Sequence, residues 1–126
     1  MDRAIVEILN AFALIFLVTV ILFSTFTIYN NMQSINSLIM LKNLKSKIEN
    51  ILEEIYFYSI YYNTSIKIEL LTTALIYIQT LNYSLLIVYL GNQQAIIKSP
   101  LHIQGGGFGY DFIFQYNNNS IFVVAT

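Results

Sequence analysis

The chain has 126 residues, of which 56% are hydrophobic and 10% are charged, and its formal net charge is −1. Because an ordinary soluble domain carries ~25% charged residues, this chain is poor in charge, and its near-neutral balance gives no electrostatic attraction to nucleic acid or to an anionic membrane surface. The absence of cysteine excludes disulfides, iron–sulfur clusters and thiol chemistry.

An apolar run from about Ile8 to Tyr29 dominates the N-terminal part of the chain, and no charged residue lies between Glu7 and Lys42. In a helix, ~20 apolar residues match the ~30 Å hydrocarbon core of a bilayer. A secretory signal peptide is the first alternative, but its apolar region has only ~7–15 residues and ends at a small-x-small cleavage site. No such site follows Phe23, so the run predicts a membrane-length helix over about residues 4–29.

The chain continues without glycine or proline after the apolar run, so nothing in residues 30–62 stops a helix. Further along, the apolar residues follow a 3-4 alternation over three heptads, which is a coiled-coil type of seam. The seam residues are Leu41, Leu44, Ile48, Ile51, Ile55, Tyr58 and Tyr62. We therefore predict one helix over 1–62 with an amphipathic half at 30–62. At ~90 Å it is too long for its own chain to cover, so lipid or other protein chains must cover its apolar surface.

The apolar period changes to two after Tyr62, as expected for strands. The predicted strands lie at 66–70, 74–78, 85–90, 95–98, 108–116 and 121–124. Turn signals separate several of them, at Leu81–Ser84, Gly91–Asn92 and Asn117–Asn119. The stretch Gly105–Gly109 indicates a flexible loop. Residues 63–126 are thus predicted to form a β-rich head with a small antiparallel β-sheet, and the chain to have an α+β fold.

Few residues suggest catalysis or ligand binding. The triglycine Gly105–Gly107 is not followed by the residues of a P-loop or of a dinucleotide-binding loop, so it indicates a turn. His102 is the only histidine, and Asp111 is the only carboxylate residue after Glu69. A catalytic or metal centre needs several such groups together. We therefore expect no catalytic residue, no cofactor and no metal site, and we do not expect the chain to be an enzyme.

Three Asn-x-Ser segments, which are candidate acceptors of N-linked glycans, lie beyond the predicted helix at loops or strand edges. They begin at Asn63, Asn82 and Asn118. None lies inside the membrane segment. If the head is outside the cell, glycans would cover a surface that has almost no charge.

A membrane-length N-terminal helix that continues into an amphipathic half and then a small β-rich head resembles the type IV pilin superfamily, in particular archaeal pilins and archaellum filament subunits. The resemblance implies that a prepilin peptidase removes a short leader, and Arg3-Ala4 before Ile5 looks like its cleavage site. It also implies a membrane-inserted precursor that an assembly ATPase and a platform protein extract. The product would be an extracellular filament on the cell surface, a homopolymer serving adhesion or motility, with helices at the axis and heads outside.

The same resemblance implies assembly roles for apolar residues of the helix. The residues expected in the axial bundle, the filament core, are Ile8, Phe12, Ile15, Phe16, Val20 and Phe23. The residues expected to join the amphipathic half of the helix to the head or to a neighbouring subunit are Leu41, Leu44, Ile48, Ile51 and Ile55.

One alternative is a permanently membrane-anchored accessory subunit, such as a minor pilin or an archaellum stator component, whose head binds a partner in the cell envelope. The same N-terminal helix would serve both functions. A membrane-bound enzyme or signalling domain is a third class, but it would need a polar constellation that the head lacks. Lys42, Lys45 and Lys47 outnumber Arg3 across the apolar run, which favours a cytoplasmic head by the positive-inside rule, whereas the pilin resemblance implies a head outside the cell.

Overall fold

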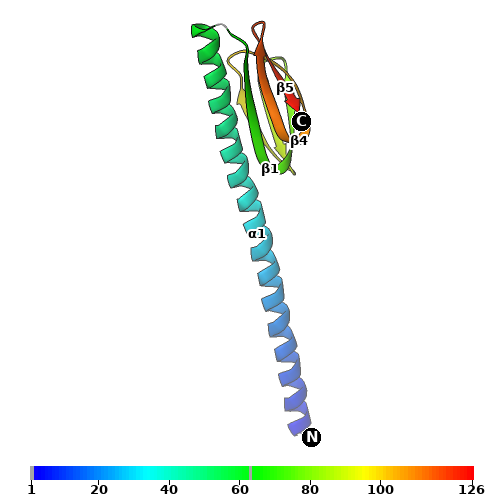
Figure 1. Cartoon of the computed structure of the whole chain (residues 1–126). Coiled ribbons are helices and arrows are strands. Elements are labelled where there is room, and N and C mark those ends of the chain that lie inside the picture. Colours follow the sequence, from blue (N-terminus) through cyan, green and yellow to red (C-terminus); the bar gives the residue numbers. More distant parts are fainter. Residues whose placement is uncertain (1, 63) are drawn as a thin grey trace. The chain divides into compact units, whose positions relative to one another are not determined.

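The computed structural model describes residues 2–62 and 64–126. Within these described residues, one helix, α1 (Asp2–Tyr61), precedes five strands (Figure 1). The strands are β1 (Ile66–Leu81), β2 (Leu85–Leu90), β3 (Gln93–Lys98), β4 (His102–Asn117) and β5 (Ser120–Ala125). The predicted α+β fold, a long N-terminal helix followed by a small sheet, is therefore confirmed.

Helix α1 extends without a break because its sequence contains neither glycine nor proline. Just after its end, the backbone N–H of Tyr62 donates to the carbonyl of Tyr58 at 2.9 Å. Spatial contacts divide the chain between Asn36 and Ser37, inside the helix, whereas the predicted boundary lies between residues 62 and 63. The helix from Ser37 onward belongs with the sheet because it contributes buried side chains to the same core.

The strands form one sheet in the order β3-β2-β1-β4-β5. Strand β1 pairs antiparallel with both β2 and β4, and β2 pairs antiparallel with β3. Strand β5 lies against two stretches of β4. It runs parallel to residues 102–106 of β4 and antiparallel to residues 112–117 of β4. The antiparallel pairing is the predicted hairpin. The parallel pairing with residues 102–106 was not predicted, because no local turn signal indicates it.

Strands β1 and β4 both change direction part of the way along. The register between them shifts between Leu71 and Ile76, so the two strands predicted at 66–70 and 74–78 are two arms of β1. The Thr72 hydroxyl lies at this irregularity, 2.6 Å from the carbonyl oxygen of Tyr110 and 2.8 Å from that of Ala74. A side-chain hydroxyl thus bonds to backbone carbonyls where the regular ladder is interrupted.

The prediction of a flexible loop at Gly105–Gly109 is wrong, because these residues lie inside β4. The three glycines at 105–107 have φ of +102°, +133° and +141°, a region that residues with a Cβ rarely adopt. A Cβ on Gly105 would overlap the carbonyl oxygen of Val123, and a Cβ on Gly106 would overlap that of Ile78. Glycine is required here because the backbones of three strands approach one another closely.

The predicted turns are confirmed. Residues 82–84, 91–92 and 118–119 connect consecutive strands. Asn118 and Asn119 have φ of +50° and +64°, and Gly91 has φ of +59°. Asparagine and glycine tolerate this left-handed region better than other residues, which is why these dipeptides indicate turns in a sequence.

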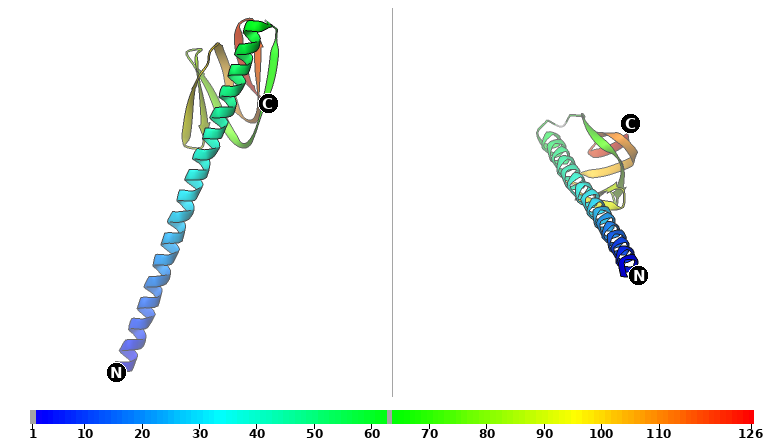
Figure 2. Two further views of the ribbon diagram at one scale, coloured as in Figure 1. Left: turned by 90° about the vertical axis from the view of Figure 1, so that its left-hand side faces the viewer. Right: turned by 90° about the horizontal axis from the view of Figure 1, so that it is seen from below.

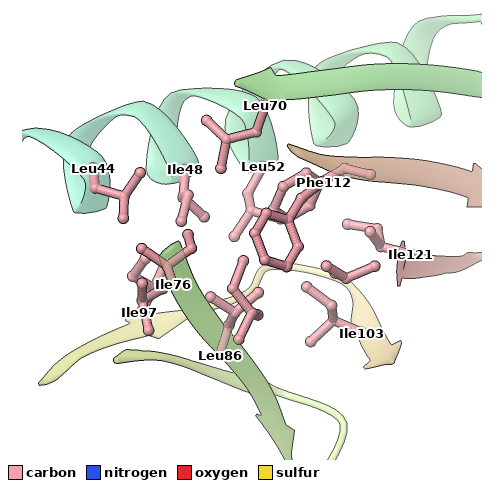
Figure 3. Packing of buried hydrophobic residues seen from close by; sticks show 14 of the residues in the cluster. Leu44, Ile48, Leu52, Leu70, Ile76, Leu86, Ile97, Ile103, Phe112 and Ile121 are labelled. Atoms are coloured by element: carbon pink, nitrogen blue, oxygen red, sulfur yellow. The ribbon is translucent and has the colours of Figure 1, made fainter. Parts of the chain in front are cut away.

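The core lies between one face of the sheet and the part of α1 that begins at Ser37, and both views of Figure 2 show this part of the helix running along the sheet. Side chains from the helix and from the strands meet in this layer, with Phe112 near its centre (Figure 3). The buried helix residues are Leu41, Leu44, Ile48, Leu52 and Ile55. The buried hydrophobic strand residues are Leu70, Ile76, Ile78, Leu86, Val88, Ile97, Ile103, Phe112, Phe114, Tyr116, Ile121 and Val123.

Candidate assembly surfaces

The part of α1 from Ile5 to Met40 presents large apolar side chains to solvent. By length and composition the helix is sufficient to cross a membrane, and no residue of its most apolar window is buried. Phe16 and Phe23, for example, are 71% and 72% exposed. Contiguous apolar surfaces of this extent mark a membrane or protein contact site.

Threonine hydroxyls in the apolar run have partners within the helix. Thr19 donates to the carbonyl of Ile15 at 2.8 Å, and Thr25 donates to that of Ile21 at the same distance. Thr27 makes the equivalent bond to the carbonyl of Phe23 at 2.9 Å. Because these hydroxyls bond to their own backbone, they add little polarity to the surface of the run.

The six residues expected in the axial bundle are all exposed, from 45% for Val20 to 72% for Phe23. At about 100° per residue they fall within about 140° of the circumference of α1. Four phenylalanines, three of them in this set, occupy about 80° of the same arc. We call this side of the helix the aromatic face; its phenylalanines are Phe12, Phe16, Phe23 and Phe26. The six residues expected in the axial bundle therefore form one continuous side of the helix, suited to contact with other chains.

The residues expected at the helix–head contact lie mostly inside the core. Leu41, Leu44, Ile48 and Ile55 are buried, and Ile51 is half-buried against the core. Leu52, which the sequence seam omits, is only 1% exposed.

The seam differs from the buried set because of helix geometry. A strict heptad has 3.5 residues per turn, but a straight helix has about 3.6, so the heptad positions drift by about 20° per heptad away from the side of the helix that faces the sheet. Leu52 therefore turns towards the sheet. The two tyrosines at the end of the seam, Tyr58 and Tyr62, are 37% and 61% exposed. A wider apolar stripe, as expected of a helix packed on a sheet, would have included Leu52.

Few ion pairs are present in the part of the chain that the structure describes. The Nε atom of Arg3 lies 3.5 Å from Oε1 of Glu7, and Nζ of Lys45 lies 3.9 Å from Oε1 of Glu49. Both pairs join residues four apart on exposed faces of α1, where ion pairs contribute little to stability. Glu7, at the start of the apolar run, thus has a partner within its own helix.

The face of the sheet that is turned away from the helix carries a row of aromatic rings. The Tyr77 ring stacks on Phe108 with centroids 4.5 Å apart and lies 5.6 Å from Tyr89. These rings, with Leu75 and Gly91, line an open groove of about 420 Å³. Phe108 is 69% exposed. The groove offers an apolar, aromatic contact surface on the head.

Two of the candidate glycan acceptors lie in exposed turns. Asn82 is in the turn between β1 and β2, and Asn118 is in the turn between β4 and β5. Asn63, the third candidate, lies outside the described residues. Both described acceptors are therefore accessible from solvent.

The two acceptor turns are neighbours in space, and His102 joins them. The His102 ring stacks on Tyr83, with centroids 4.5 Å apart and an interplanar angle of 13°. On its other side, Nδ1 of His102 lies 3.3 Å from Oγ of Ser120. The backbone N–H of Ile103 also donates to the carbonyl of Tyr83 at 2.9 Å. Both acceptors thus lie at one polar end of the sheet.

No group of three His, Cys, Asp or Glu residues within 2–62 and 64–126 is arranged to hold a metal ion. The only histidine contacts a tyrosine ring and a serine hydroxyl, and across those same ranges no carboxylate is hydrogen-bonded to it. A serine–histidine pair without an orienting acid, on an exposed strand end, has a structural explanation as a link between two turns.

Comparisons with protein-family models, with curated proteins and with solved structures find no match for this chain. A functional interpretation therefore depends on the surfaces of the chain itself. The two most distinctive are the exposed apolar part of α1 and the aromatic groove on the sheet.

Proposed function

We propose that the chain is a structural subunit of an extracellular filament of the type IV pilus kind, which polymerises through the apolar part of α1 after a membrane-inserted precursor stage. The observation that carries this proposal is that one continuous helix has two kinds of surface. Large apolar side chains are exposed over Ile5–Met40, and a buried seam over Leu41–Ile55 fixes the same helix to a folded head. Such a helix can leave lipid only where other chains cover it.

The energetics favour assembly once the helix is outside lipid. Burial of a large apolar side chain contributes about 1.5–3 kcal/mol relative to water. The six residues expected in the axial bundle therefore contribute on the order of 10 kcal/mol per subunit. Relative to lipid this gain nearly disappears, because lipid tails are as apolar as neighbouring helices. Extraction from the membrane therefore needs external work, which the proposal assigns to an assembly ATPase and a platform protein, after cleavage by a prepilin peptidase near Arg3-Ala4.

The heads would form the outer surface of this filament, with the polar end of the sheet glycosylated. The two described acceptors, Asn82 and Asn118, are exposed, as transfer of a glycan requires. We expect glycopeptides containing each asparagine in mass spectra of the mature protein. Ser84→Ala should remove the glycan at the first acceptor and Ser120→Ala that at the second, since each serine completes its Asn-x-Ser segment. Unmodified peptides at both positions would contradict this part of the proposal.

The filament proposal is tested on material sheared from producing cells. Negative-stain images should contain thin fibres, and mass spectrometry should find this chain as their dominant protein, with a mature N-terminus near Ile5 or Arg3. The precursor should remain in the membrane fraction after alkaline extraction. If fibres are present without this chain, and the chain stays in the membrane, the filament proposal is wrong.

A permanently anchored accessory subunit is the second candidate, and the aromatic groove favours it. The rings of Tyr77, Tyr89 and Phe108 give the head a contact surface that polymerisation through α1 does not require. This candidate predicts a few copies per assembly machine, with the chain retained in the membrane and bound to an envelope partner through the groove. Quantitative mass spectrometry of fibre and membrane fractions separates the two candidates by copy number.

A further inference from the structure

Two polar side chains in the apolar run differ from the threonines around them. Thr19, Thr25 and Thr27 each bond to a backbone carbonyl of α1. Across the described ranges 2–62 and 64–126, neither the amide of Asn10 nor the hydroxyl of Ser24 has a hydrogen-bond partner. Both residues are exposed. In hydrocarbon, an amide without a partner is costly, so Asn10 needs a partner outside its own helix.

The two residues lie on one side of α1. At about 100° per residue, Asn10 and Ser24 are about 40° apart around the helix and about 21 Å apart along it. Only aliphatic residues lie between them on this side. We call this side the aliphatic stripe; its members are Asn10, Leu14, Leu17, Ile21, Ser24 and Ile28. It faces away from the aromatic face, because the four phenylalanines are centred about 160° from Asn10.

We propose that the aliphatic stripe is a pairing surface between two copies of this chain in the membrane, with the Asn10 amide of each copy bonded to Asn10 of the other. This inference rests on the membrane-inserted stage of the proposed function. A carboxamide both donates and accepts, so an identical group at the same depth satisfies it. Copies inserted in one orientation form a parallel, two-fold symmetric pair, which places each Asn10 opposite its counterpart.

The pairing surface also has the shape that close helix contact requires. Leucine and isoleucine at 3-4 spacing pack as knobs into the holes of a parallel partner, and the small Ser24 side chain allows a second polar contact at its own level. A pair formed in this way leaves both aromatic faces directed away from the contact. Stored precursors would then be paired and would still present the face that the filament needs.

The absence of cysteine allows a direct test in the full-length chain in native membranes. Leu17→Cys places a thiol on the aliphatic stripe, and Leu22→Cys places one about 140° away around the same helix, so the second variant is a matched control. After mild oxidation, we expect several-fold more disulfide-linked dimer from Leu17→Cys than from Leu22→Cys. Equal cross-linking at the two positions would overturn the proposal.

The role of the amide is tested in the Leu17→Cys background. Adding Asn10→Leu should lower the dimer yield about threefold to tenfold, the range expected for loss of one or two interhelical hydrogen bonds in a membrane. Asn10→Gln, which keeps a carboxamide, should restore most of the yield. If Asn10→Leu leaves the yield unchanged, the amide contact is refuted.

Failure of this inference can be told apart from failure of the proposed function. Alkaline extraction of the same membranes reports insertion independently of cross-linking. If the chain is extracted as a soluble protein, the membrane stage is wrong and the pairing with it. If the chain stays in the membrane but cross-links equally from both positions, only the pairing is wrong. The proposed function is then still decided by whether sheared filaments contain this chain.

Discussion

Gly106 lies where two backbones come too close for any side chain. Its φ is +133°, and a Cβ there would overlap the carbonyl oxygen of Ile78. We expect Gly106→Ala to lower the free energy of unfolding of the head by about 2–4 kcal/mol, from backbone strain and from the displaced strand together. Thermal or urea unfolding of the full chain in detergent, followed by near-ultraviolet circular dichroism of the head tyrosines, measures this loss.

Gly91 provides the matched control for this substitution. Its φ of +59° is also left-handed, but nothing lies within 4 Å of the position that a Cβ would occupy there. Gly91→Ala should therefore cost only about 1–2 kcal/mol, the strain of the left-handed backbone alone. Equal losses for the two variants would mean that the close approach of the Ile78 carbonyl is not what makes Gly106→Ala costly.

The glycines also mark where residue-level prediction from sequence succeeds and where it does not. Asn118 and Gly91 are correctly predicted to lie in turns, because a left-handed turn is a local requirement that the residue type itself reports. The triglycine at 105–107 is wrongly predicted to be a loop. Its conformation depends on contacts with Val123 and Ile78, which come from other strands, and no local pattern encodes them.

At the scale of the element, α1 and the sheet meet through a buried stripe on one side of the helix, and the heptad positions drift away from that side. Leu52 is 1% exposed and packs in the core, whereas its neighbour Ile51 is half-buried. We expect Leu52→Ala to lower the free energy of unfolding by about 2–5 kcal/mol, and Ile51→Ala by about 1 kcal/mol, since less apolar area is lost. Denaturant unfolding of the two full-length variants in detergent compares them directly. A larger loss for Ile51→Ala would support the strict heptad seam instead.

Elements whose pattern is local are predictable from this sequence. The uninterrupted α1 follows from the absence of glycine and proline, and β2 and β3 follow from apolar runs around Gly91. The bend in β1 between Leu71 and Ile76 and the parallel contact of β5 with residues 102–106 are not predictable in this way. Both depend on which strands meet, and that is decided by the packing of the whole head.

At the scale of the whole molecule, the exposed apolar part of α1 and the exposed groove on the head make different demands on a partner. Phe16 and Phe108 are the same residue type and are almost equally exposed, at 71% and 69%. One lies on the aromatic face of the helix and the other in the groove. The same substitution at the two positions therefore separates polymerisation through the helix from partner binding through the head.

We expect Phe16→Ala to reduce the amount of sheared filament strongly, because each subunit loses about 1.5–3 kcal/mol of apolar burial and that loss recurs along the polymer. Alanine remains compatible with lipid, so the precursor should still resist alkaline extraction from the membrane. Phe108→Ala should leave the filament yield unchanged. The reverse result, filaments insensitive to Phe16→Ala and an envelope partner lost with Phe108→Ala, would identify the chain as an anchored subunit that works through its head.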